Sequence, residues 1–184
     1  MSHQTVIVLD FGGQYNQLIA RRVRECNVYC EVMPCTTPLS QLKAMDPIGI
    51  IFTGGPNSVY LDSSPHVDPE IFTWGVPILG ICYGCQLMAH TLAARSPRPR
   101  TIPLGNTARP RPTTTPPLPS SRACPQEGIS WMSHGDYMAK VPDGFALTAH
   151  SDSCPMCHCG RARASMGPVP PRGQPHPARI DMIT

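Results

Sequence analysis

Short apolar runs alternate with amphipathic segments along the first 93 residues. The apolar runs are rich in Val and Ile and have the length of strands that are buried on both faces. Segment 14–25 instead places Leu18, Ile19 and Val23 at helical spacing. The pattern predicts strands at 6–9, 28–33, 48–52 and 77–82, and helices at 14–25, 40–45 and 83–92.

This alternation predicts the fold class. Strands that alternate with helices form a parallel sheet that is covered on both faces. We therefore expect an α/β fold with a doubly wound, mostly parallel open sheet and a core at 4–93. Functional groups of such sheets gather at the carboxyl ends of the strands. Gly54, Gly55 and Cys82 follow strand ends of this kind.

The remainder of the chain has a different composition. Residues 95–126 and 156–184 lack periodicity and hold most of the prolines and arginines. Between them, residues 128–132 and 145–150 are predicted to be strands of a hairpin or meander. We expect a single domain over 1–184 that is incomplete in its C-terminal part. Low order is expected at 95–126 and 156–184, because such segments bury too little apolar surface to offset their ordering entropy.

Several features indicate a cytoplasmic protein. No apolar run approaches the roughly 20 residues that span a membrane. The N-terminus lacks the basic-then-apolar order of a signal peptide. The nine cysteines are irregularly spaced, which favours reduced thiols over a disulfide framework. We expect neither a membrane nor a nucleic acid as partner, since the basic stretches are also the unstructured ones.

Cys82 is the strongest candidate for chemistry. The segment 80–84, Gly-Ile-Cys-Tyr-Gly, has the form of a nucleophile elbow, in which a sharp strand-to-helix turn exposes the central side chain. The following helix points its N-terminus at the sulfur, and its partial positive charge favours the reactive thiolate. The alternative is a buried structural cysteine, which is the commoner fate of an isolated Cys.

A thiolate that attacks an amide carbonyl also needs donors for the oxyanion. The backbone amide of Tyr83, directly after the nucleophile, is one candidate. The second is the amide of Gly55, where no side chain blocks the approach. A plain turn is the alternative interpretation of the Gly54-Gly55 pair.

Four motifs carry a family resemblance. They are Val8-Leu-Asp-Phe-Gly-Gly-Gln-Tyr15, Phe52-Thr-Gly-Gly-Pro-Asn-Ser-Val-Tyr60, Gly80-Ile-Cys-Tyr-Gly-Cys-Gln86 and Ser133-His-Gly-Asp-Tyr-Met-Ala-Lys140. Together they resemble the class I glutamine amidotransferase half of the GMP synthase family. The resemblance covers 4–93 and 127–155.

The resemblance implies a reaction and a pocket. Cys82 would take the γ-glutamyl group from glutamine as a thioester, release ammonia, and be freed by water. The pocket for glutamine would be lined by Gly54, Gln86, Ser133, His134 and Asp136. The ammonia would pass to an ATP-dependent synthetase domain that aminates XMP. ATP and Mg²⁺ belong to that domain, which lies outside this chain, and the amidotransferase domain itself needs no cofactor.

One expected motif is missing. The family supplies its base and orienting carboxylate from a His-Pro-Glu motif, whereas this chain has His176-Pro177-Ala178. Read one base out of frame, suitable codons for 167–179 spell Val-Gln-Phe-His-Pro-Glu-Val-Asn-His-Thr-Pro-His-Gly. Residues 113–125 similarly spell Tyr-Tyr-Asp-Thr-Ser-Ser-Pro-Leu-Phe-Lys-Gly-Leu-Pro. We infer that small insertions or deletions shift the reading frame in both stretches.

The frame shift also removes a candidate metal site. Residues 154–159, Cys-Pro-Met-Cys-His-Cys, look like zinc ligands. Shifted by one base, residues 157–161 can instead read Ala-Ile-Ala-Asp-Glu, so we expect no metal.

Three functions are consistent with these observations. The first is a glutaminase domain of GMP synthase that is nearly inactive as written, because the base is missing. The second is a catalytically dead domain that binds glutamine and regulates a synthetase. The third is another cysteine hydrolase on a related scaffold, such as a deglycase or a peptidase.

Overall fold

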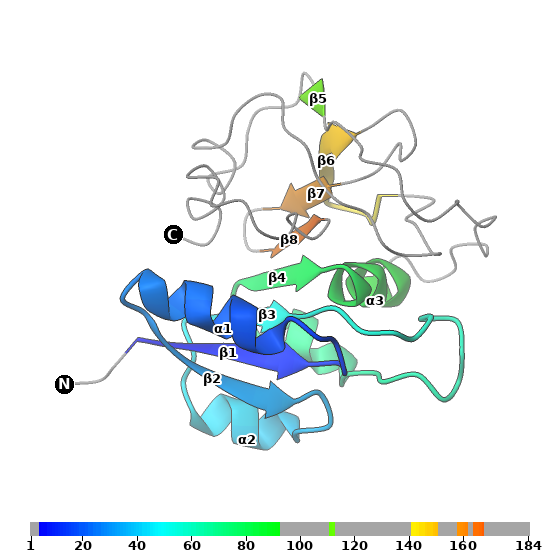
Figure 1. The fold of residues 1–184 in the computed structure, drawn as a ribbon. Coiled ribbons are helices and arrows are strands. Elements are labelled where there is room, and N and C mark those ends of the chain that lie inside the picture. The colour runs from blue at the N-terminus through cyan, green and yellow to red at the C-terminus, as the bar shows by residue number, and fades with distance from the viewer. Residues whose placement is uncertain (1–3, 93–110, 113–140, 151–157, 162–163, 168–184) are drawn as a thin grey trace.

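A computed structural model describes residues 4–92, 111–112, 141–150, 158–161 and 164–167, and the structural statements below concern these residues (Figure 1). The elements in chain order are β1 (Thr5–Asp10), α1 (Asn16–Glu25), β2 (Tyr29–Pro34), α2 (Leu39–Ala44), β3 (Gly49–Phe52), the 3₁₀ helix η1 (Pro69–Phe72), β4 (Ile78–Ile81), α3 (Tyr83–Leu92), β5 (Arg111–Pro112), β6 (Ala146–His150), β7 (His158–Arg161) and β8 (Ala164–Gly167).

The strands form one open sheet in the order β2-β1-β3-β4-β8-β7-β6-β5. From β2 to β8 the neighbours are parallel, and from β8 to β5 they are antiparallel. The chain reverses its direction of winding at β1, which lies between β2 and β3. The predicted fold class is confirmed, and the carboxyl ends of β1, β3 and β4 meet at one edge of the sheet.

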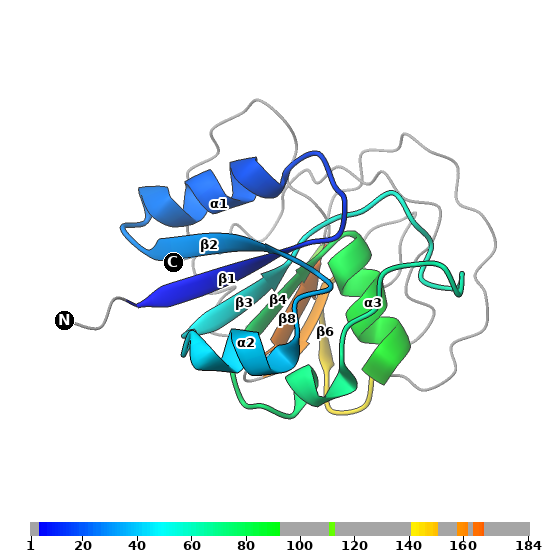
Figure 2. The same ribbon diagram turned by 90° about the horizontal axis from the view of Figure 1, so that it is seen from below.

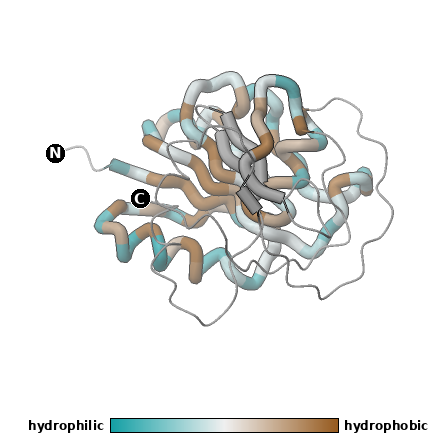
Figure 3. Tube along the Cα trace, turned by 90° about the horizontal axis from the view of Figure 1, so that it is seen from above, coloured by the Kyte–Doolittle hydropathy of each residue, from teal (hydrophilic) through white to brown (hydrophobic). Residues whose placement is uncertain are grey.

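Helices cover both faces of the sheet, as Figure 2 shows: α1 lies on one face, and α2 and α3 lie on the other. The period of two along each strand explains the two cores. In β1, Ile7 and Leu9 pack in the cluster under α2 and α3, whereas Val8 packs under α1. Figure 3 shows hydrophobic residues concentrated along the central strands.

The C-terminal part differs from the sequence-based expectation. Residues 158–161 and 164–167 form β7 and β8, and β8 pairs with β4 in parallel. Low order was expected over 156–184; these eight residues instead form strands, and the remainder of that stretch lies outside the described residues. Strands pair through backbone N–H and C=O groups, and every residue type except Pro has both. The unpaired edge of β4 can therefore bind a neighbouring strand whatever the side chains of that strand are.

The predicted strand at 145–150 is confirmed as β6, which pairs with β7. Its expected partner at 128–132 lies outside the described residues, as does most of 95–126. None of the helices in the described ranges is long and apolar enough to cross a membrane.

Candidate functional site

Cys82 lies at the junction of β4 and α3, as the elbow motif predicts. Its backbone φ of 54° is in the left-handed region, which costs a residue with a side chain about 1–3 kcal/mol. In the part of the chain that the structure describes, the other non-glycine residues with positive φ are Asn27 and Asp46, types that tolerate this region well. The strained conformation at a cysteine therefore points to a functional turn.

The two glycines of the elbow allow it to pack closely. A Cβ on Gly84 would lie 2.5 Å from both Cβ and the carbonyl oxygen of Phe52 in β3. A Cβ on Gly80 would lie 2.6 Å from Sδ of Met88. The Gly84 N–H also donates to the Thr53 carbonyl oxygen at 3.0 Å, which joins the start of α3 to the end of β3.

The sulfur of Cys82 is partly buried beside the segment that follows β3. A Cβ on Gly54 would lie 3.6 Å from Sγ, so this wall of the site is bare backbone. Burial raises the pKa of the Cys82 thiol above its ordinary value, and the backbone N–H groups of Tyr83 and Gly55 act in the opposite direction. The helix N-terminus was expected to favour the thiolate; burial of the sulfur acts in the opposite direction and outweighs the two amides.

The same observation brings together the residues expected to bind an oxyanion. The amide of Tyr83, at the start of α3, and the amide of Gly55, in the loop after β3, both interact with Sγ of Cys82. Two N–H groups that converge on a nucleophile also lie near the carbonyl that it would attack.

Thr53 ties the end of β3 to the end of β1. It is fully buried, and its hydroxyl donates to the Leu9 carbonyl oxygen at 2.8 Å and accepts from the Phe11 N–H at 3.4 Å. Its own N–H donates to Leu9 at 3.2 Å. These hydrogen bonds therefore fix the start of the segment that carries Gly54 and Gly55 relative to β1.

The side chain of Tyr83 is structural. It is fully buried, its hydroxyl donates to the Pro65 carbonyl oxygen at 2.6 Å, and its ring lies 5.4 Å from that of Phe11. Burial raises the pKa of this phenol, which therefore stays protonated at neutral pH. These contacts hold the first turn of α3, and with it the Tyr83 amide, against the sheet.

The remaining predicted pocket residues are placed only in part. Gln86 is buried in α3, and its N–H donates to the Cys82 carbonyl oxygen at 3.1 Å. Ser133, His134 and Asp136 lie outside the described residues. Within the described ranges, no group of three His, Cys, Asp or Glu side chains could hold a metal ion.

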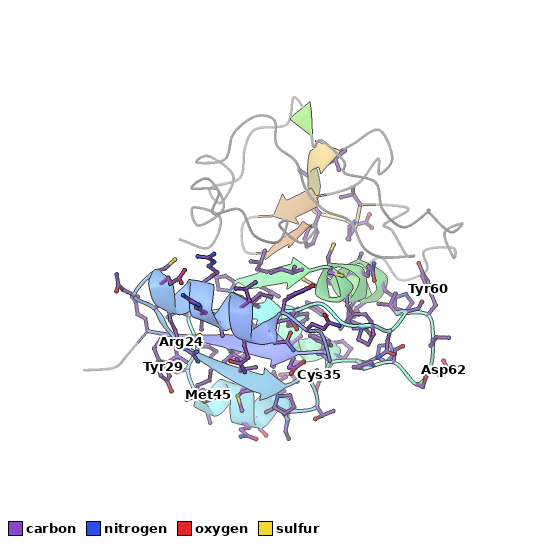
Figure 4. All side chains as sticks on the ribbon, in the orientation of Figure 1. Arg24, Tyr29, Cys35, Met45, Tyr60 and Asp62 are labelled. Atoms are coloured by element: carbon purple, nitrogen blue, oxygen red, sulfur yellow. The ribbon has the colours of Figure 1, made fainter. Side chains whose placement is uncertain are left out.

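A histidine on α3 was not singled out by the sequence. His90 packs edge-on against Tyr60, with ring centroids 5.3 Å apart. Figure 4 shows Tyr60 and Asp62 in the loop after β3, and Cys35 just after β2, at the end of the molecule that carries the elbow. Arg24 and Tyr29 lie at the opposite end.

The sequence also left the turn after β1 without a role. This turn lies against Gly54 and Gly55: a Cβ on Gly13 would collide with the Gly54 backbone, and a Cβ on Gly55 with that of Phe11. The only signal for this contact was the Gly12-Gly13 pair directly after a strand.

Comparison with known proteins agrees with this geometry. Residues 7–166 match the sequence profile described as "Glutamine amidotransferase class-I". The chain is similar to "GMP synthase [glutamine-hydrolyzing]" of Caldicellulosiruptor saccharolyticus, with 49% identity over 160 residues, 87% of this chain and 31% of the relative. It is 50% identical over 151 residues to the protein of the same name from Clostridium perfringens, covering 82% of this chain and 29% of the relative. The chain thus spans less than a third of the length of these curated relatives.

Solved structures share the fold. A Thermoplasma acidophilum protein, described as a candidate component of a GMP synthase, superposes with a TM-score of 0.73 at 21% identity, over all of this chain and 91% of the other. A glutamine amidotransferase of Thermotoga maritima gives a TM-score of 0.67 at 18% identity, over 90% and 75% of the two chains.

Proposed function

Because the chain belongs to the class I glutamine amidotransferase family, we propose that it is a glutaminase domain of the GMP synthase type, with Cys82 as its nucleophile. The observation that carries this proposal is the strained elbow at Cys82, where one amide from α3 and one from the loop after β3 converge on the sulfur. The relatives with about half of their aligned residues identical to this chain are named for glutamine hydrolysis.

The proposed reaction proceeds in two stages. Sγ of Cys82 attacks the side-chain carboxamide carbon of glutamine, while the amides of Gly55 and Tyr83 stabilise the developing oxyanion. The carbon–nitrogen bond breaks, the nitrogen takes up a proton and leaves as ammonia, and a γ-glutamyl thioester remains. Water then attacks the thioester and releases glutamate and the free thiol. Gly54, Gln86, Ser133, His134 and Asp136 would hold the substrate.

The ammonia needs an acceptor beyond this chain. We propose an ATP- and Mg²⁺-dependent synthetase domain that aminates XMP in purine biosynthesis, in the cytoplasm. The chain covers only 31% and 29% of its GMP synthase relatives, which leaves room for such a domain in those proteins.

The chain as written should turn over slowly. Cys82 has a raised pKa and needs a base, yet the sequence lacks the His-Pro-Glu motif. A missing general base typically costs roughly 10²–10⁴-fold in rate. We propose that shifted reading frames at 113–125 and 167–179 removed it.

The test compares ammonia release from glutamine in two forms of the chain. One is the chain as written, and the other carries the frame-restored readings of 113–125 and 167–179. We expect the restored form to turn over at least about 10²-fold faster than the chain as written, and Cys82→Ala to abolish turnover in the restored form. Turnover that survives Cys82→Ala, or a folded restored chain that releases no ammonia, would overturn the proposal.

A second candidate is a glutamine-binding domain that regulates a synthetase without catalysis. The absent His-Pro-Glu motif favours it, since the loss of a base leaves the nucleophile's pocket untouched. Calorimetry of the chain as written separates the two: glutamine binding without turnover supports a binding domain, and no binding supports a damaged glutaminase.

A further inference from the structure

The peptide between Gly54 and Gly55 has to face in one particular direction for the proposed chemistry. Its N–H, on Gly55, interacts with Sγ of Cys82. Since a trans peptide is planar, the Gly54 carbonyl oxygen points the opposite way. A flipped peptide would turn that oxygen toward the sulfur and replace a donor with an acceptor. The direction in which the Gly54 carbonyl is held therefore decides whether the oxyanion donor exists.

The turn at residues 11–16, between β1 and α1, occupies the side of this peptide that the carbonyl faces. A Cβ on Gly13 would lie 2.4 Å from the Gly54 oxygen and 2.9 Å from its carbon. A Cβ on Gly55 would lie 2.5 Å from the carbonyl oxygen of Phe11. In both cases the atom that an added Cβ would meet belongs to the backbone, which cannot yield as a flexible side chain would. The turn and this peptide therefore approach as closely as they do because both positions are glycine.

Asn16 holds the turn in this position. It is the first residue of α1 and is 6% exposed, and its Nδ2 donates to the Gly13 carbonyl oxygen at 2.9 Å. Its Oδ1 is buried and has no hydrogen-bond partner among the described residues. A buried side-chain amide whose oxygen has no partner is unfavourable if it serves packing alone. The hydrogen bond from Asn16 to Gly13 therefore explains best why an asparagine occupies this position.

We propose that the 11–16 turn fixes the orientation of the Gly54–Gly55 peptide, with Gly13 and Asn16 as positioning residues for the oxyanion donor. The inference rests on the proposed role of the Gly55 amide. Its physical route is short: Asn16 holds Gly13, Gly13 blocks the Gly54 carbonyl from turning, and the Gly55 N–H stays directed at Cys82.

The test is the pH dependence of Cys82 alkylation by iodoacetamide, followed by site-resolved mass spectrometry. In Gly13→Ala the new methyl displaces the Gly54 carbonyl, so the thiolate loses a donor. We expect its apparent pKa to rise by about one pH unit and the alkylation rate near neutral pH to fall about tenfold. Asn16→Ala, which removes atoms instead of adding them, should shift the pKa in the same direction by a smaller amount.

Gly49→Ala in β3 is the matched control. Its Cβ would meet only ordinary contacts, the Pro77 oxygen at 3.8 Å and Val6 Cγ2 at 3.9 Å, so the pH profile should match that of the parent chain. Should Gly13→Ala not fold, as judged by circular dichroism, Asn16→Ala decides alone. A parental pH profile in the folded variants would overturn the proposal.

This readout needs no glutamine. If the frame-restored chain folds but releases no ammonia, which contradicts the proposed function, the alkylation profile of Cys82 still reports whether the turn controls the donor.

Discussion

Cys82 occupies a backbone conformation that few cysteines adopt, and its sulfur lies where burial disfavours charge. Desolvation and hydrogen bonding act on the same atom with opposite sign, and desolvation is the larger. The thiol is therefore the ground state at neutral pH. A nucleophile in this setting depends on a base to remove its proton during attack.

The pH dependence of Cys82 alkylation follows from this balance. Because the folded-state pKa is raised, the reactive thiolate appears only as the pH rises beyond the ordinary thiol value of about 8.5. Site-resolved alkylation with iodoacetamide should give a midpoint above that value, and Cys82→Ser should abolish the signal. A midpoint below it would show that the helix N-terminus and the amides outweigh burial.

Thr53 is expected to contribute to stability by joining the ends of β3 and β1, and this contribution can be measured. Thr53→Val keeps the shape of the side chain but removes the hydroxyl that bonds Leu9 and Phe11 in a fully buried position. Leaving those backbone groups with fewer partners should lower the free energy of unfolding by about 1–3 kcal/mol in urea titration. Thr73→Val is the control, since its hydroxyl donates to Glu70 at an exposed site, where water can replace it. Equal losses in the two variants would contradict the anchoring role of Thr53.

At the scale of elements, α1 and α3 contribute differently. α3 is buried along most of its length, from Tyr83 to Ala89, because it packs on β3, β4 and β8 of the sheet. α1 is amphipathic and buries only one stripe, with Arg21 and Arg22 paired to Glu25 on its outer side. The helix that presents the Tyr83 amide is thus the better fixed of the two.

Matched leucine substitutions measure this difference. Leu87→Ala in α3 removes a fully buried side chain and should cost about 2–5 kcal/mol of unfolding free energy. Leu18→Ala in α1 affects a side chain that is 46% exposed and should change stability by no more than about 0.5 kcal/mol. Similar losses in the two variants, measured by thermal or urea unfolding, would be inconsistent with the buried position of α3.

Most elements of the first 92 residues were predictable from the sequence. The strand and helix ends lie within about two residues of the predicted ones, because apolar runs and helical periodicity are strong local signals. The 3₁₀ helix η1 was not predicted, since its four residues carry no periodic pattern. β7 and β8 were missed because their pairing depends on a neighbouring edge and not on their own composition.

The site was predictable in outline. Cys82, Gly55 and Tyr83 come together as their motifs indicated. Two features required the structure: the net effect of burial on the thiol, and the contact of Gly13 with Gly54, which are 41 residues apart in sequence. Both depend on three-dimensional packing that no short window of sequence contains.

At the scale of the whole molecule, the sheet continues past β4 through β8. β4, which leads into the elbow, is paired on both sides, with β3 and with β8. β2 is an edge strand that pairs only with β1 among the described strands. The strand that leads into Cys82 should therefore be hydrogen-bonded to a neighbour on each side.

Hydrogen–deuterium exchange tests this arrangement. The amides of β4 should exchange as slowly as those of β1, and more slowly than the outward-facing amides of β2. Chain truncation after Gly160 removes β8 and should accelerate exchange in β4 but not in β1. Edge-like exchange of β4 in the full chain would show that residues 164–167 do not pair with it.

The central claim is that Cys82 attacks a glutamine side chain, and covalent labelling of the frame-restored chain with a γ-chloroketone analogue of glutamine tests it most directly. We expect one label per chain, located on Cys82 by peptide mass spectrometry, and protection by excess glutamine but not by asparagine. Labelling spread over several cysteines, or labelling of Cys82 that glutamine does not slow, would contradict the account.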